Sequence, residues 1–347
     1  MQVDYIVVGI GLAGINFCEQ LRQNNKSFVV FDNGSQLSSA VAGGLYNPVV
    51  LKRFTSVWKS KEQLELALPF YASLEKLLKV KLDYKIPVYR KFASTEEQNN
   101  WFTASDKPLI AEFLSDKIIK NYNESIDAPF GFGEVFNTGR IDVKTLIDAY
   151  KDFLKKQNSF FEVDFDYETL KITPDYVKYE ALEAKKIVFA EGFGIKQNPF
   201  FNHLPLVPAK GELLIIHAPE LKIDFVLKSA AFLIPIGNDL YIVGATYEWK
   251  DLTNKTSLKA KEELLEKLKM LMACPFKVVN QMAGVRPTVK DRRPLVGSHL
   301  VYKNMYVLNG LGTRGVMIGP YVAKQLYNFI ENEMALEREI DIKRFIS

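Results

Sequence analysis

Cysteine and histidine are scarce in this sequence of 347 residues, which contains two of the former and three of the latter. Cys18 and Cys274 lie far apart in the chain, and His203, His217 and His299 do not follow the short spacings of a metal-binding motif. This pattern argues against a disulfide-stabilised scaffold and against a zinc site. We expect Cys18 to be a small buried residue of a helix, because free cysteines mostly serve as packing.

Long hydrophobic runs are also missing. No stretch of about 20 apolar residues occurs, and the apolar beginning of the chain, MQVDYIVVGIGLAGINF, carries no basic region before it. Neither a membrane span nor a secretory signal is therefore expected, and a cytoplasmic location is the default expectation. Internal repeats and low-complexity tracts are absent as well.

Charge is abundant but never concentrated. The 45 lysines and arginines exceed the 41 acidic residues by only four, and they form no basic block. A nucleic-acid partner is therefore weakly signalled, although not excluded, and an acidic small molecule is the simpler partner. With 48% hydrophobic and 25% charged residues, the chain has the composition of a globular protein of one large or two closely joined domains.

The first 32 residues do contain a nucleotide-binding pattern. An apolar strand over 3–8, the turn GIGLAG, a helix from residue 12 and a second strand over 27–32 predict a βαβ unit with parallel strands. Gly9, Gly11 and Gly14 give the spacing that permits a tight turn, a close pyrophosphate and close helix packing. Asp32 stands where an acid binds ribose hydroxyls. We therefore predict one dinucleotide site.

A second such site is missing. The nearest candidate in mid-chain, EGFGIK, contains Gly192 and Gly194 but no third glycine. Enzymes that use both a flavin and a nicotinamide usually carry two fingerprints, so the sequence indicates one cofactor. If that cofactor is a flavin, the substrate itself must supply the electrons.

The remaining chain alternates between α/β and antiparallel patterns. In chain order we expect two helices over 61–80 separated at Pro69, strands at 86–92 and 130–136 around a short helix at 95–102, a helix at 141–156, strands at 159–165 and 187–192 around a hairpin at 173–175, strands at 211–217, 230–236 and 240–249, a helix at 257–272, a strand at 304–310, and a last helix after a glycine turn. The predicted fold class is α/β, with a Rossmann-like dinucleotide-binding domain (1–80, 140–200 and 285–347) and a discontinuously inserted, mostly antiparallel α+β substrate domain (81–139 and 201–284).

Three arginines and two prolines share one short segment, GVRPTVKDRRPLVG, from Gly284 to Gly297. Pro287 and Pro294 disfavour helix in the residues before them, so Arg286 and Arg293 are expected to be extended. A guanidinium on such a rigid mount either forms a structural ion pair or clamps a ligand anion. The segment alone leaves both roles open.

Several motifs in fixed order resemble one family. They are GIGLAG with Asp32, AGGLYNP (42–48), IVFAEG (187–192), KGELLII, VGATYE (243–248), GVRPTVKDRRPLVG and NGLGTRGVMIGP. Together, from residue 3 to about residue 330, they resemble the FAD-dependent D-amino-acid oxidase superfamily. The resemblance is greatest to glycine and sarcosine oxidases and to the oxidase domain of the bifunctional tRNA wobble-uridine-modifying enzyme.

This resemblance implies FAD bound in an extended pose. The glycine triplet would face the pyrophosphate, Asp32 the ribose, Val163 the adenine, and the start of the last helix the flavin, where its dipole stabilises negative charge. The residues that we predict to bind FAD are Gly9, Gly11, Leu12, Ala13, Gly14, Asp32, Asn33, Ala42, Gly43, Gly44, Leu45, Val163, Ala190, Gly192, Gly310, Leu311, Gly312, Thr313, Gly315 and Val316. We expect non-covalent binding, because no histidine lies near AGGLYNP and no cysteine follows Cys274.

The family position of the arginine in G-x-R-P implies that Arg286 binds the substrate carboxylate above the flavin. Arg314 is predicted as a second anion contact, and Tyr247 as a possible substrate partner whose more common role would be packing. Arg292 and Arg293 are interpreted as surface or structural residues that pair with Asp291 or a glutamate. Glu212, Tyr46 and Asn47 depart from residues common in the family and predict a pocket of different size and polarity.

The implied reaction is oxidation of the C–N bond of a small amino acid or secondary amine, with oxygen or another acceptor as the final oxidant. Four alternatives stay open: a flavin-dependent 2-hydroxy-acid dehydrogenase, an oxidase that acts on a tRNA-linked amine, a flavoprotein without enzymatic activity, and an NAD-dependent dehydrogenase. The substrate identity and the oligomeric state are not encoded in any pattern that we find.

Overall fold

The predicted βαβ unit is present at the start of the computed structural model, which describes residues 1–345. Strand β1 (Gln2–Val8) pairs in parallel with β2 (Phe28–Phe31), and helix α1 (Leu12–Gln23) connects them. Tyr5 lies opposite Phe28 in the register. Cys18 is fully buried in α1, which confirms its expected packing role.

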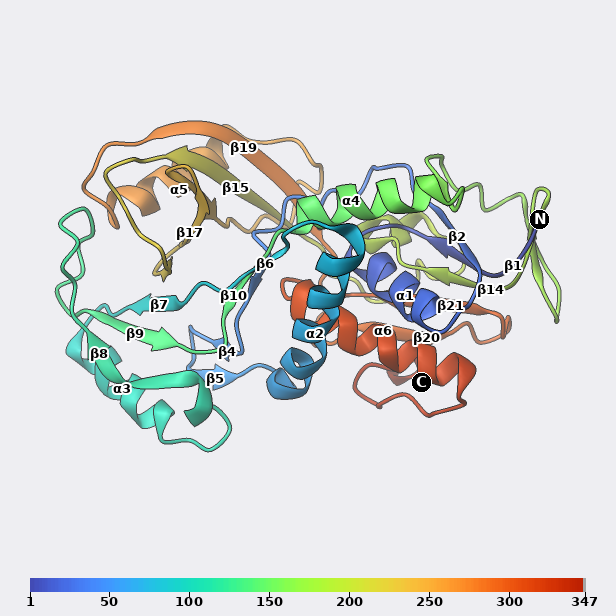
Figure 1. The fold of residues 1–347 in the computed structure, drawn as a ribbon, viewed down its shortest axis with the longest axis horizontal. Coiled ribbons are helices and arrows are strands. Elements are labelled where there is room, and N and C mark those ends of the chain that lie inside the picture. Colours follow the sequence, from blue (N-terminus) through green and yellow to red (C-terminus); the bar gives the residue numbers. More distant parts are fainter. Residues whose placement is uncertain (346–347) are drawn as a thin grey trace.

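The first large sheet is built around this parallel pair (Figure 1). Its order is β11-β2-β1-β14-β13-β12, with β21 on β14 and β20 on β21. The added strands are β11 (Phe160–Phe161), β12 (Leu170–Ile172), β13 (Val177–Tyr179), β14 (Leu182–Phe189), β20 (Leu295–Ser298) and β21 (Met305–Asn309). The strands β11, β2, β1, β14 and β21 are parallel, whereas β12, β13 and β20 are antiparallel additions. The hairpin expected at 173–175 joins β12 to β13.

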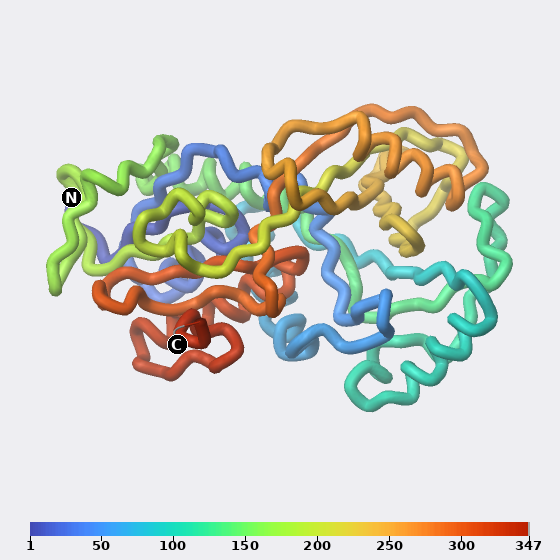
Figure 2. The backbone as a smooth tube through the Cα atoms, turned by 180° about the vertical axis from the view of Figure 1, so that it is seen from behind, coloured from blue at the N-terminus to red at the C-terminus, as the bar shows by residue number. Residues whose placement is uncertain are grey.

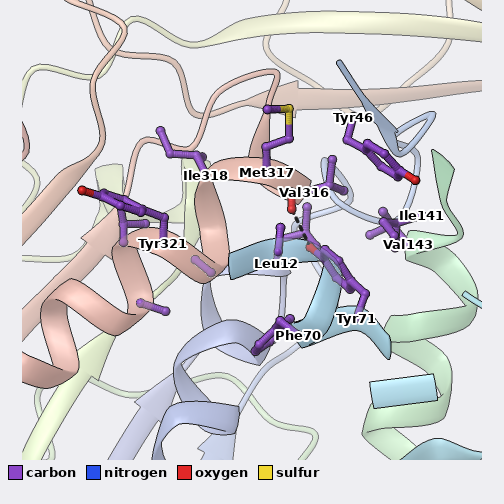
Figure 3. Packing of buried hydrophobic residues seen from close by; sticks show 14 of the residues in the cluster. Leu12, Tyr46, Phe70, Tyr71, Ile141, Val143, Val316, Met317, Ile318 and Tyr321 are labelled. Carbon is purple, nitrogen blue, oxygen red and sulfur yellow. Dashed lines mark hydrogen bonds between the residues drawn. The ribbon is translucent and has the colours of Figure 1, made fainter. Parts of the chain in front are cut away.

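Both faces of this sheet are buried, as parallel sheets require. Val7 and Val30 belong to the hydrophobic cluster under the helices, whereas Val8 and Val29 belong to the cluster on the opposite face. The covering helices are α1, α2 (Ser60–Leu78), α4 (Val143–Lys156) and α6 (Gly315–Glu331). Tyr71 of α2 donates a hydrogen bond to the Val316 carbonyl at 3.0 Å, which attaches α2 to the first turn of α6 (Figure 3).

The prediction of two helices separated at Pro69 is wrong. Residues Ser60–Leu78 form one helix with Pro69 inside it. Proline removes one backbone donor and usually kinks or ends a helix. In this helix Phe70, Tyr71 and Leu74, which follow the proline, are buried. Their packing outweighs the free-energy cost of a proline inside the helix.

The second large sheet is curved and mostly antiparallel, in the order β19-β15-β18-β17-β16-β7-β9-β8. Only β16 and β7 pair in parallel. Its strands are β7 (Val88–Lys91), β8 (Leu114–Ile119), β9 (Phe132–Val135), β15 (Ala209–His217), β16 (Val226–Lys228), β17 (Phe232–Gly237), β18 (Leu240–Gly244) and β19 (Lys277–Arg286), and its helices are α3 (Thr95–Ser105) and α5 (Leu258–Lys269). The predicted antiparallel arrangement of 211–217, 230–236 and 240–249 is confirmed.

Two predicted strands are shorter than expected. The strand predicted at 159–165 consists of Phe160–Phe161 alone, because Phe165 turns back and stacks on Tyr179 with ring centroids 4.4 Å apart. The strand predicted at 240–249 ends at Gly244, after which the N–H groups of Thr246 and Glu248 donate to the carbonyls of Glu212 and Lys210 near the start of β15.

The two large sheets lie side by side, with short strands between them (Figures 1 and 2). These are β3 (Leu45–Tyr46), β6 (Asp83–Tyr84) and β10 (Gly139–Ile141) in one sheet, and β4 (Val49–Val50) with β5 (Thr55–Ser56) in another. The chain passes several times between the two halves. The domain boundaries given above stay a prediction. None of the described helices is long and apolar enough to cross a bilayer.

Candidate functional site

A cavity of about 600 Å³ lies where the two large sheets meet. Its wall combines the turn after β1, represented by Gly9 and Gly11, with Gly244 and Gly284 of the second sheet and Gly315 at the start of α6. A Cβ atom at Gly9, Gly244, Gly284 or Gly315 would come within 3 Å of neighbouring protein atoms, so these backbone segments pack closely around the enclosed space. The cavity is therefore framed by backbone on several sides, which suits an extended ligand.

The turn after β1 requires glycine for steric reasons. Gly9 has a φ of +99°, a left-handed conformation that other residues rarely adopt. A Cβ atom at Gly14 would lie 1.9 Å from the Gly9 carbonyl oxygen, so only glycine lets α1 start this close to β1. The N-cap residue Gly11 offers no side-chain cap, and the Leu12 N–H donates to Ser39 Oγ at 3.2 Å, so the other N–H groups of the first turn are the ones available to an anion.

Asp32 stands at the end of β2, beside this turn. Its carboxylate accepts hydrogen bonds from the backbone N–H groups of Ile10 at 3.3 Å and Gly34 at 3.0 Å. Lys151 of α4 forms an ion pair with it at 3.1 Å. These contacts fix the carboxylate on the cavity wall, where it fits the predicted ribose contact. The lysine partner could not be read from the sequence, because it comes from a helix 119 residues away.

Most of the predicted FAD-binding residues line the cavity. They are Gly9, Gly11, Leu12, Ala13, Asp32, Asn33, Ala42, Gly43, Gly44, Leu45, Val163, Ala190, Gly192, Leu311, Gly312, Thr313, Gly315 and Val316. Gly14 and Gly310 are not part of the wall. Gly14 faces the Gly9 carbonyl and allows α1 to pack against the turn. A Cβ at Gly310 would lie 2.7 Å from a Val289 methyl group. A helix N-terminus with available N–H groups, together with an acidic side chain placed to bind ribose hydroxyls, fits a dinucleotide.

Arg286 ends β19 and projects into the cavity. Its guanidinium lies over Gly211, where a Cβ would come within 1.9 Å of Nη2. Nη1 donates to the Thr246 carbonyl at 3.3 Å, and the guanidinium carbon lies 4.8 Å from the centre of the Tyr247 ring. Within residues 1–345 no carboxylate pairs with Arg286. Burial lowers the pKa of this group, but an arginine stays charged at neutral pH.

Tyr247 lies beside Arg286 on the cavity wall, whereas Arg314 lies at the start of α6. Tyr247 lines the cavity and is 53% exposed, and its ring stacks on the exposed Trp249 at 6.1 Å. Arg314 precedes α6 but is not part of the cavity wall; its Nη1 donates to the Asn47 carbonyl at 2.9 Å. Burial lowers the pKa of Arg314 to about 10.

The other two arginines of the 284–297 segment are not part of the cavity wall. Arg293 pairs with Glu339 at 3.1 Å, as the structural interpretation anticipated, whereas Asp291 pairs with Arg344. Arg292 lies in the turn between β19 and β20 and has a left-handed backbone conformation, with a φ of +58°.

The expected effect of Glu212, Tyr46 and Asn47 on the pocket is wrong, because none of them lines the cavity. Glu212 is buried and accepts hydrogen bonds from Ser257 and Gln281, and Tyr46 donates to Asp83 at 2.8 Å. These side chains serve the packing between elements.

Glu191 is a buried acid that sequence reasoning missed, although it lies within the motif IVFAEG. Its side chain is 8% exposed, accepts hydrogen bonds from Tyr167 and from Asn198 (2.7 Å), and lines the cavity. Burial raises the pKa of Glu191 to about 7. The only signal in the sequence was a carboxylate directly after an otherwise apolar strand.

This raised pKa gives a testable pH dependence. Because the folded protein holds the Glu191 proton more tightly than the unfolded chain, the stabilisation is complete below the ordinary glutamate pKa and is lost as the pH rises to about 7. We expect the free energy of unfolding to fall between pH 5 and 7, with a contribution of up to about 3 kcal/mol from this group. Urea denaturation at pH 5 and pH 7 should show a smaller difference in the free energy of unfolding for Glu191→Gln than for the unmodified protein. Glu168→Gln, on the exposed loop nearby, is the control, and equal slopes in all three proteins would contradict the assignment.

The fold and the cavity are those of a dinucleotide-dependent oxidoreductase. Residues 4–328 match the model of the DAO family, described as FAD dependent oxidoreductase, so the chain belongs to this family. The predicted family, fold class and FAD cofactor are thereby confirmed, and the nicotinamide alternative is excluded.

Two kinds of characterised relative are similar to this chain. Glycine oxidase of Bacillus subtilis is 21% identical, over 94% of this chain and 93% of its own length. The tRNA 5-methylaminomethyl-2-thiouridine biosynthesis bifunctional protein MnmC is 27% identical over 47% of this chain in Idiomarina loihiensis, and 21% identical over 96% of it in Campylobacter jejuni. These matches cover 29% and 56% of the two MnmC proteins, so the chain spans little more than half of their length at most.

Solved structures share the fold over the whole chain. Glycine oxidase from Geobacillus kaustophilus superposes with a TM-score of 0.81 at 18% identity and covers 100% of both chains. Iminodiacetate oxidase from Chelativorans gives a TM-score of 0.76 at 16% identity, with 97% and 98% covered. At these identities the comparison establishes the architecture alone.

Proposed function

We propose that the chain oxidises the C–N bond of a small amino acid or secondary amine whose carboxylate is bound by Arg286. The observation that carries this proposal is a cation in the cavity wall with no carboxylate partner in the described chain. A buried guanidinium without a counterion is costly, and a substrate carboxylate would supply one with suitable bidentate geometry. The relatives named as glycine oxidase and iminodiacetate oxidase support the same substrate class.

FAD fits the remaining wall of the cavity. The turn at Gly9 and Gly11 and the start of α1 would hold the pyrophosphate, and Asp32 the ribose, while the 310–316 turn would hold the flavin. When bound, FAD supplies an acceptor for the hydride that leaves the substrate carbon. The absence of a histidine near AGGLYNP and of a cysteine after Cys274 favours non-covalent binding.

The contribution of the protein to the reaction would be alignment and desolvation. Arg286 fixes the carboxylate end of the substrate, and Pro287 holds the arginine backbone in place. The wall nearby contains Phe232, Ile234 and Ile242. An apolar wall disfavours the ammonium form of the substrate, so it would promote the neutral amine from which a hydride can leave.

A second candidate is an oxidase for an amine attached to tRNA. It is favoured by one observation: Tyr247 and Trp249 are exposed, stacked on one another and adjacent to Arg286. Exposed aromatic rings can stack on unpaired bases. The names of the MnmC relatives point the same way.

The proposal predicts that a suitable amine bleaches the flavin absorbance under anaerobic conditions. The purified FAD-loaded protein would be mixed with glycine, sarcosine, D-amino acids and 2-hydroxy acids in turn. Bleaching by an amine and not by a hydroxy acid supports C–N oxidation. Bleaching by hydroxy acids alone would replace it with the dehydrogenase alternative, and a flavin that only tRNA bleaches would favour the second candidate.

A further inference from the structure

A second cation reaches the cavity from the same sheet as Arg286. Lys228 is the last residue of β16 and lines the cavity, with its Nζ 4.2 Å from the centre of the Phe232 ring. In the described part of the chain no acidic side chain forms an ion pair with it. The mechanism proposed above gives this lysine no role.

The charges around Lys228 are positive or already paired. Arg90 lies opposite it on β7 and binds Glu97 at 2.6 Å, and Lys267 of α5 binds Glu263 at 2.5 Å. Burial, together with Arg90 and Lys267, lowers the pKa of Lys228 to about 8. This end of the cavity therefore has an excess of positive charge that the protein itself leaves uncompensated.

Lys228 and Arg286 line the cavity from different strands of one sheet. The guanidinium of Arg286 covers Gly211 on β15, and the strand order from there is β15, β18, β17, β16. Three strand spacings, roughly 14 Å, separate the strand that carries Gly211, which the guanidinium covers, from the strand that carries Lys228. The contact of Nζ with Phe232, one strand nearer to Arg286, shortens the gap between the charged groups. A compact molecule with an anion at each end fits this arrangement.

We infer that the cavity selects a substrate with two anionic groups, one bound by Arg286 and the other by Lys228. This inference rests on the proposed function and narrows it to a dicarboxylic amine. A neutral amino acid such as glycine would occupy only the Arg286 end and leave Lys228 desolvated beside two other cations. A second carboxylate would complete the site. A phosphate of a tRNA-linked substrate shares this chemistry, and the experiment separates the two sources.

Binding of unreactive ligands tests the inference without turnover. The dissociation constants of butyrate and glutarate for the FAD-loaded protein would be measured from changes in the flavin spectrum. We expect glutarate to bind 10- to 100-fold more tightly, the range of a charge-assisted hydrogen bond. Lys228→Met should abolish this preference. Lys277→Met, an exposed lysine of β19 outside the cavity wall, should keep it.

The pH dependence provides a check that needs no variant. Lys228 is charged below a pKa of about 8, so the preference for glutarate should decline as the pH rises above that value. Equal binding of butyrate and glutarate by the unmodified protein at pH 7 would overturn the inference.

Turnover distinguishes failure of this inference from failure of the proposed function. Iminodiacetate should have at least a tenfold higher kcat/KM than sarcosine, and Lys228→Met should remove the difference through KM. If both amines bleach the flavin and the variant affects them equally, only the inference fails. If glutarate binds as expected and no amine bleaches the flavin, the proposed function fails. A third outcome concerns RNA: tRNA competes with glutarate, Lys228→Met abolishes this competition, and iminodiacetate is not turned over. This result would show that Lys228 binds a phosphate of RNA, and it would overturn the inference of a dicarboxylic substrate.

Discussion

Replacement of Arg286 by glutamine should lower kcat/KM for the amine substrate by about 100- to 1,000-fold. The variant leaves a substrate carboxylate without its cation in an apolar cavity, and loss of one partner of a buried charge pair costs about 2–5 kcal/mol. Because Arg286 pairs with no carboxylate in residues 1–345, the fold should not depend on it. Steady-state kinetics, with flavin content measured from the visible spectrum, check both expectations.

Arg293→Gln is the matched control for this experiment. Arg293 belongs to the same segment, but it binds Glu339 away from the cavity. Its variant should retain the kcat/KM of the unmodified protein within about twofold, because an exposed ion pair contributes little. An Arg286→Gln protein that is as active as this control would show that the carboxylate binds elsewhere.

Gly14→Ala should abolish FAD binding and destabilise the protein by more than about 3 kcal/mol. Its Cβ would lie 1.9 Å from a backbone oxygen of Gly9, which no side-chain rotation relieves, so α1 must move away from β1. Flavin retention on purification and denaturation by urea measure the two effects. The expected loss is larger than that for removal of any single contact to the cofactor, because the whole anion-binding turn is displaced.

Gly237→Ala provides the comparison for this variant. Gly237 also has a positive φ, of +89°, but no atom lies within 4 Å of its missing Cβ. Its substitution should cost about 1 kcal/mol from backbone strain and leave FAD bound. If the two variants behave alike, the close approach at Gly14 is not what limits the turn.

The parts of the fold that depend on neighbouring residues were predictable from the sequence. The glycine turn and Asp32 lie within one βαβ unit, so spacing alone placed them together. Lys151 and Lys228 were not predictable, because α4 meets β2, and β16 faces the cavity, only after the two sheets have assembled. Pro69 led to the opposite error. The general rule that proline ends a helix predicted a break there, but tertiary packing keeps residues 60–78 in one helix. The orientation of the Arg314 side chain was not predictable either, because it bonds to the carbonyl of Asn47, which lies 267 residues earlier in the chain.

The cavity wall draws on residues from Val8 to Val316. This has a consequence for the synthesis of the protein. A chain emerging from the ribosome exposes its glycine turn first, but the opposite wall is not available until the start of α6 has left the exit tunnel. Capture of FAD is therefore expected late in synthesis, once both walls of the cavity are present.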